Sequence, residues 1–133
     1  MPALRAGLAY WGLIFALGFA LGTVRTLWLA PAVGPLAAVG IELPIMLGAS
    51  LWLARRLIRR HGITASAEAL VMSGTAFALL LISEAALARL LGGQSLADWA
   101  ADLASPPGAL GLAGQIAFAL LPLVLVRRAP RGG

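Results

Sequence analysis

The chain has 133 residues, of which 61% are hydrophobic and only 11% charged, and it has no cysteine and a formal charge of +5. Its mean hydropathy of +0.95 predicts an integral membrane protein, and the missing cysteines exclude disulfides, thiol catalysis and iron–sulfur ligation. The positive charges stand mostly at the ends of apolar runs, which indicates membrane topology and anionic lipid headgroups as partners, with no nucleic acid.

A membrane span takes about 20 apolar residues in a helix, so the chain has room for four spans and little else. We expect one all-α transmembrane domain, residues 1–133, folded as a four-helix bundle. The first apolar stretch is too long for a cleaved signal peptide and has no A-x-A site soon after it, so we expect it to be retained. The predicted spans are residues 7–30, 36–57, 65–91 and 108–126.

The first span has aromatic residues near both ends, where such rings prefer the headgroup level: Tyr10, Trp11 and Trp28. Gly18, Gly22 and Arg25 follow at spacings of four and three, so they share one helix face. Because small residues allow helix backbones to approach closely, this face is predicted to contact a neighbouring helix.

A turn is predicted after the first span, at Pro31, Gly34 and Pro35. Pro44 lies inside the second span, and it is expected to kink the helix and to free a backbone carbonyl beside Glu42. Four arginines then resist translocation and mark a cytoplasmic loop that contacts lipid headgroups: Arg55, Arg56, Arg59 and Arg60.

Residues 92–107, after the third span, are too polar to cross a membrane. Ser95 followed by Asp98 is typical of a helix N-cap, and Leu96, Trp99 and Leu103 recur on one face. We therefore expect a short amphipathic helix on the membrane surface that ends at the following prolines.

With four spans, most arginines fall on one side of the membrane: Arg5, the four of the middle loop, and Arg127, Arg128 and Arg131. The positive-inside rule then puts both termini in the cytoplasm. The predicted location is the inner, cytoplasmic membrane, crossed several times.

Each span contributes one polar residue at a similar depth, about 9–12 Å from its outer end at about 1.5 Å per residue. These residues are Arg25, Glu42, Glu84 and Gln115. Buried charges are costly in a bilayer, so they are expected to face inward and form one polar cluster.

Two interpretations of this cluster remain open. In the first, it is a buried ion-pair network that fixes helix order and register. In the second, one arginine cannot neutralise two carboxylates, so a proton or a cation shares the site. We expect Arg25 to pair with Glu42, since they belong to consecutive helices, which leaves Glu84 as the titrating or cation-binding group.

No catalytic residue, metal site or cofactor is predicted. His61 is the single histidine and lies at a helix end beside arginines, so no histidine-based metal or haem site is supported. The hydroxyl groups of the spans have no histidine or lysine beside them in the polar layer that would activate a nucleophile.

The hairpin carries the motif G-T-x-R-x-L followed by E-x-P-x-M, here Gly22, Thr23, Arg25 and Leu27, then Glu42, Pro44 and Met46. Over most of its length the chain resembles a group of small four-span bacterial membrane proteins with this hairpin. The resemblance implies the four-span fold and no particular activity.

Two functions from different classes follow from the residues. The first is a small transporter or channel that binds a proton, a cation or a small polar solute at the cluster. The second is a non-catalytic accessory or assembly subunit whose buried charges pair with a larger membrane complex. An enzyme acting on lipid ranks third. Besides lipid, the expected partners are further copies of the chain or that larger complex.

Overall fold

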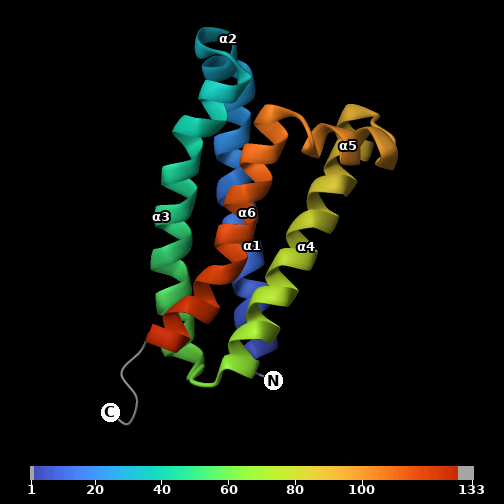
Figure 1. Cartoon of the computed structure of the whole chain (residues 1–133). Coiled ribbons are helices and arrows are strands. Elements are labelled where there is room, and N and C mark those ends of the chain that lie inside the picture. The colour runs from blue at the N-terminus through green and yellow to red at the C-terminus, as the bar shows by residue number, and fades with distance from the viewer. Residues whose placement is uncertain (1, 129–133) are drawn as a thin grey trace.

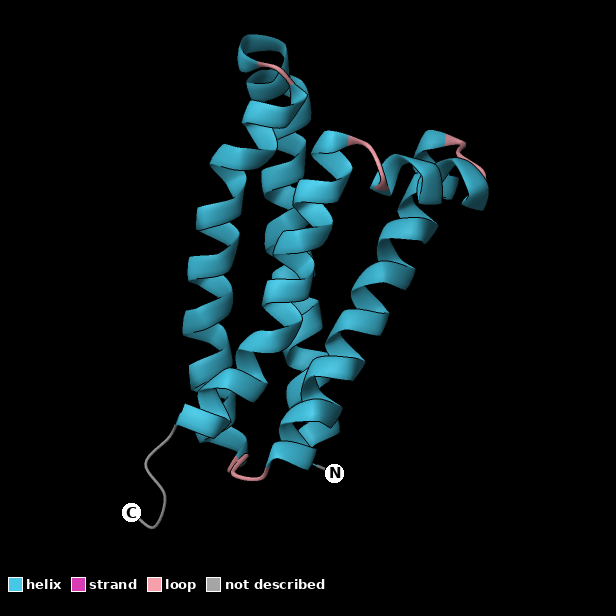
Figure 2. Cartoon of the chain, in the orientation of Figure 1, coloured by secondary structure: helices cyan, strands magenta, loops and turns pink. Residues whose placement is uncertain are grey.

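The computed structural model describes residues 2–128, and this part of the chain is helical apart from short turns, with no strand (Figures 1 and 2). The first long helix consists of three consecutive pieces, which are α1 (Pro2–Val24), a π-helical turn η1 (Arg25–Leu29) and α2 (Ala30–Val33). The remaining elements are α3 (Pro35–His61), α4 (Ser66–Gly92), the short α5 (Leu96–Leu103) and α6 (Pro106–Arg128).

Four helical segments are long and apolar enough to cross a membrane, which confirms the predicted all-helical class and its four candidate spans. They are Pro2–Val33, Pro35–His61, Ser66–Gly92 and Pro106–Arg128. Large apolar side chains on their outer faces, such as Leu13, Ile45 and Ile82, are more than half exposed. Such exposure suits a lipid environment better than water.

The four long helices surround a common interior. Both α1 and α6 pack against α3 and α4, and within residues 2–128 the backbones of α1 and α6, and those of α3 and α4, do not approach each other closely. The order around the ring is therefore α1, α3, α6, α4. In Figure 1, α4 moves away from α6 as it approaches α5, so the helices are closer at one end than at the other.

The buried core fills the end of the molecule where α1 begins and the α3–α4 loop lies (Figure 1). Small residues of α1, α3 and α4, such as Ala6, Ala54 and Ala76, are fully buried there. Tyr10 lies at the inner edge of this core. Its hydroxyl donates to the backbone carbonyl of Phe118 at 2.6 Å, and the two rings stack with centroids 4.1 Å apart. The contact spans the interior from α1 to α6.

The sequence-based placement of Tyr10 at the headgroup level is therefore wrong, because its ring is fully buried. The helix begins at Pro2 rather than at residue 7, which moves Tyr10 about 12 Å along the helix from its start. Trp11 is partly buried, and its Nε1 donates to Ser83 Oγ at 3.0 Å, which ties α1 to α4. Trp28 is mostly exposed, at 66%.

The first helix also ends later than predicted, since it continues through Pro31 to Val33. Proline has no N–H and cannot complete the preceding turn of an α-helix. The chain widens into a π turn just before it, in which the Ala30 N–H donates to the Arg25 carbonyl. The helix stops at Gly34, whose φ of +93° is strained for other residues.

The predicted close helix contact at Gly18 and Gly22 is not found. A Cβ at Gly18 would be 3.4 Å from the Met46 Cε atom, and one at Gly22 would meet only the chain's own Arg25. Close packing occurs instead at Gly7, where a Cβ would lie 2.9 Å from the Met72 carbonyl oxygen. The face with Gly18 and Gly22 lines a cavity, described below.

The helix predicted after the third span is present as α5. Ser95 caps it, with its hydroxyl accepting from the Asp98 N–H at 3.1 Å. Two prolines follow α5 as expected, and they also form the first turn of α6, where a missing N–H has no cost. Gly93 ends α4 in the left-handed conformation, at a φ of +66°.

Packing at Gly7 gives a direct test of how α1 meets α4. Gly7→Ala would force its methyl group against the Met72 carbonyl and Thr75, and we expect the free energy of unfolding to fall by about 1–3 kcal/mol. Gly12→Ala is the control, because nothing lies within 4 Å of the added atom. Thermal unfolding in detergent measures both, and equal melting temperatures for the two variants would contradict this packing.

Candidate functional site

A cavity of about 790 Å³ opens between the helices on the side of Tyr10 and Phe118 away from the core. Its floor contains Ile14, Ser50 and Phe118, and its lining extends to Leu91 at the end of α4 and Leu103 of α5. The volume falls within the range of small-molecule sites, about 300–1,000 Å³. All four residues of the predicted polar layer line it: Arg25, Glu42, Glu84 and Gln115.

Arg25 is the first residue of the π turn η1. Its guanidinium lies back over Gly22, where an added Cβ would be 3.5 Å from Nη2. A methyl group at Gly22 would therefore be in ordinary van der Waals contact with the guanidinium.

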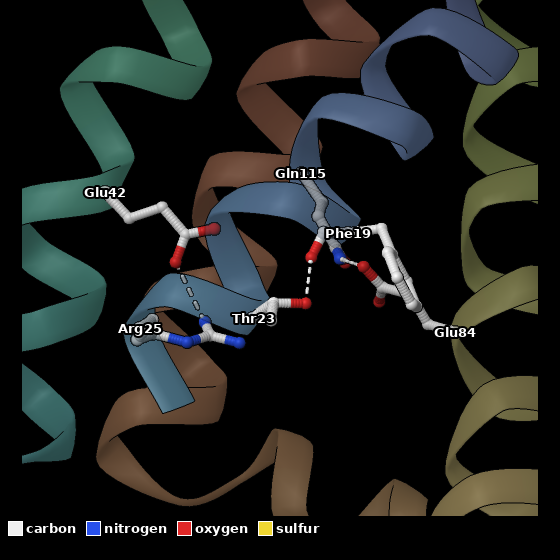
Figure 3. A network of polar contacts seen from close by, with 6 residues as sticks. All are labelled: Phe19, Thr23, Arg25, Glu42, Glu84 and Gln115. Atoms are coloured by element: carbon white, nitrogen blue, oxygen red, sulfur yellow. Dashed lines mark hydrogen bonds and ion pairs between the residues drawn. The ribbon is translucent and has the colours of Figure 1, made fainter. Parts of the chain in front are cut away.

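Arg25 points toward Glu42 of α3, with Nη1 3.1 Å from Oε2 (Figure 3). The arginine side chain is 35% exposed and the glutamate side chain 14%. No N–H is directed at Oε2 with hydrogen-bond geometry, so this oxygen is paired by charge and still lacks a donor. Glu42 is thus neutralised but incompletely solvated by the protein.

Glu84 of α4 meets Gln115 of α6 on another part of the cavity wall (Figure 3). The Gln115 Nε2 atom donates to Glu84 Oε1 in a short hydrogen bond. Gln115 Oε1 is buried and has no donor. The partner of Glu84 is therefore a neutral amide, and no arginine or histidine forms an ion pair with it among residues 2–128.

The other predicted residues lie apart from the cavity. Pro44 is inside a continuous α3, its side chain is exposed, and it does not line the cavity. The four arginines predicted in the middle loop belong instead to the end of α3; they are exposed at the opposite end of the molecule, where the Arg56 guanidinium lies 5.6 Å from the Trp52 ring centroid. Arg127 and Arg128 are in the last turn of α6, and Arg131 lies outside the described residues.

Two contacts that shape the site were not predicted from the sequence. Tyr10 lies behind the cavity and donates to Phe118, which lines it, and Trp11 donates to Ser83, the neighbour of Glu84. Their signal was the spacing of Gly7, Tyr10 and Ile14, which follow one another at three and four residues and continue toward Gly18. That periodicity marks a buried helix face.

The chemistry of the arrangement is that of binding. Within residues 2–128 no group of three histidine, cysteine, aspartate or glutamate side chains is gathered to hold a metal ion. The cavity instead presents two carboxylates, one guanidinium and one amide on an apolar wall. A few convergent polar groups in an apolar pocket are typical of sites that bind and orient small molecules.

The ion pair can be tested by a double-mutant cycle on Arg25 and Glu42. Arg25→Ala leaves the Glu42 carboxylate without a positive partner, and we expect a loss of about 1–3 kcal/mol. This is less than for a fully buried pair because the arginine is one-third exposed. Arg25→Ala with Glu42→Gln should recover part of that loss.

Arg89→Ala is the matched control, since Arg89 is exposed in the last turn of α4. Thermal unfolding of wild type, Arg25→Ala, Glu42→Gln and the double variant in one detergent gives the coupling energy. A coupling energy of zero, or an equal loss in the Arg89 variant, would show that the pair does not stabilise the fold.

The cavity's polar groups come from four different segments of the chain, so packing of the whole fold assembles the site.

Comparisons of this chain with protein-family models, with curated proteins and with solved structures find no match. The assignment of function therefore depends on the cavity, its charges and its access.

Proposed function

We propose that the chain is a small multi-pass transporter of a bacterial inner membrane that binds a proton, a cation or a small polar solute at the polar cluster. Its four candidate spans form a bundle in the bilayer, with both termini in the cytoplasm. The observation that supports this most directly is a cavity that contains every charged residue from the middle of the helices and is blocked at one end.

Access from one side at a time is what distinguishes a transporter from an open pore. The Tyr10–Phe118 contact and the core behind it fill the interior on one side of the cluster. On the other side α4 diverges from α6 and the cavity extends to α5 (Figure 1). With the arginine-rich loop in the cytoplasm, this state faces outward.

The Glu84–Gln115 pair suits a carboxyl group that gains and loses charge. The amide N–H donates to an ionised carboxylate, and rotation of the amide by 180° would present its oxygen to a protonated carboxyl group. Both forms of Glu84 therefore keep a hydrogen bond. A carboxylate paired with an arginine lacks this property, because protonation breaks the ion pair.

An accessory subunit would instead offer a charge to a partner protein on its outer surface. In the described residues, the charged side chains from the middle of the helices all line the internal cavity: Arg25, Glu42 and Glu84. This inward placement favours solute binding over pairing with a larger complex. As a transporter, the chain is expected to form a homo-oligomer.

Water access to the cavity can be measured with single cysteines, since the chain has none of its own. Leu112 lines the cavity. Ile116, four residues later on α6, is 45% exposed and does not line the cavity. In proteoliposomes we expect a membrane-impermeant thiol reagent to modify Leu112→Cys from one side and to leave Ile116→Cys unmodified. Equal labelling of both, or labelling of neither, would contradict a water-filled cavity inside a membrane domain.

Glu84 is expected to carry the transported charge. Solid-supported membrane electrophysiology should record charge displacement by wild-type protein after a concentration jump of protons, Na⁺ or a small organic cation. Glu84→Gln keeps the acceptor for Gln115 Nε2, so it should unfold at the same temperature and lose the displacement.

Glu68→Gln is the control, because Glu68 is a carboxylate of the same helix in its first turn, far from the cavity. It should retain the charge displacement. If Glu84→Gln behaves like wild type, Glu84 has no part in transport, and if no tested cation displaces charge, the transporter proposal is wrong.

A further inference from the structure

The charge of the cavity indicates what kind of solute it takes. Its lining contains one guanidinium, Arg25, and two carboxylates, Glu42 and Glu84, and its other side chains are uncharged. With all three ionised the cavity has a formal charge of −1, from one positive and two negative groups. An uncompensated charge is expensive next to apolar walls, so a single positive charge is the best complement.

The hydrogen-bonding groups of the cavity specify the solute further. Gln115 Oε1 is a buried acceptor without a donor, and Glu42 Oε2 is paired by charge with Arg25 but accepts no hydrogen bond; both residues line the cavity. A buried acceptor left unpaired costs about 1–3 kcal/mol. A cation that carries N–H groups can donate to these oxygens, whereas a fully methylated ammonium has no N–H to donate.

Apart from the hydroxyl groups of Thr23, Thr26 and Ser50, the rest of the wall is apolar, and it includes phenylalanine rings. A bare metal ion would gain nothing from this wall, and within residues 2–128 no cluster of three acidic or imidazole ligands is present to replace its hydration shell. The volume of about 790 Å³ exceeds what a small inorganic ion requires. A solute with a hydrophobic body uses both the wall and the space.

We infer that the cavity binds an amphipathic organic monocation, a protonated primary amine with a hydrophobic body, whose ammonium group lies between Glu42, Glu84 and Gln115. This inference rests on the proposed function and specifies the substrate class of the same site. Glu84 provides the uncompensated negative charge. Glu42 Oε2 and Gln115 Oε1 accept hydrogen bonds from the N–H groups of the ammonium. Arg25 remains paired with Glu42 and limits the site to one positive charge.

Four compounds that share a phenyl ring and differ in their polar group separate the contributions of charge and of N–H donors: benzylammonium, benzyltrimethylammonium, benzyl alcohol and benzoate. Isothermal titration of the whole chain in nanodiscs of neutral lipid measures their affinities, with empty nanodiscs correcting for partition into lipid. We expect benzylammonium to bind at least about tenfold more tightly than the alcohol. The trimethyl compound should be intermediate, because it has the charge without the donors, and benzoate should not bind.

Two substitutions locate the effect. Glu84→Gln should reduce the preference for benzylammonium over benzyl alcohol by about tenfold or more. Gln115→Met removes the unpaired acceptor together with the donor to Glu84, and it should lower the affinity for benzylammonium more than the affinity for the trimethyl compound. Glu68→Gln should bind all four compounds as wild type does. The comparison of compounds on wild-type protein keeps the test decisive even where a variant does not fold.

Protection of an introduced cysteine separates this inference from the proposed function. Benzylammonium should slow the labelling of Leu112→Cys at concentrations where benzyl alcohol does not. If the cysteine is labelled and protons or Na⁺ displace charge, but benzylammonium neither binds nor protects, the inference is wrong and the transporter proposal stands. Equal affinity for amine and alcohol, or tighter binding of benzoate, would also overturn it. If the cysteine is not labelled, the proposed function fails first.

Discussion

Tyr10 and Phe118 stack across the interior, and the tyrosine hydroxyl donates to the phenylalanine carbonyl. Because α1 and α6 have no other close approach in the described structure, this pair spans the width of the ring. On one side of it small residues such as Ala6 and Ala76 let the helices pack closely. On the other side the helices diverge and leave the cavity. The contact therefore sets both the depth of the cavity and the end at which it is blocked.

The polar groups lie just beyond this contact. Gln115 precedes Phe118 by three residues, which is about 4.5 Å along the helix axis. Polar groups this close to a largely apolar floor receive little hydration from that direction, and their interactions are stronger than in water. Compensation has to come from neighbouring side chains or from whatever occupies the cavity. For this reason we expect a carboxylate without an ion-pair partner to have a large effect on what the cavity binds.

Hydropathy predicted the four helices, and equal depth predicted the layer that Arg25, Glu42, Glu84 and Gln115 share, because both depend only on the rise per residue. The sequence could not predict which residues seal the interior. An aromatic residue near the start of an apolar run suits either a lipid interface or a core, and the choice for Tyr10 depended on a helix that begins five residues earlier than expected. The continuation of the first helix through Pro31 was not predicted either, because a π turn can accommodate a proline that would end an α-helix.

The two carboxylates of the cavity have different partners, and this difference assigns them different roles. Glu42 has the charge of Arg25 beside it, which is the first residue of the π turn. Glu84 has only the amide of Gln115. A cation entering the cavity is therefore attracted chiefly by Glu84, while Arg25 neutralises Glu42 and repels a second positive charge. With one cation bound the cluster is neutral, and with two it would carry a net positive charge in an apolar cavity. In the proposed site, the arginine therefore pairs with Glu42 and also restricts binding to one monovalent cation.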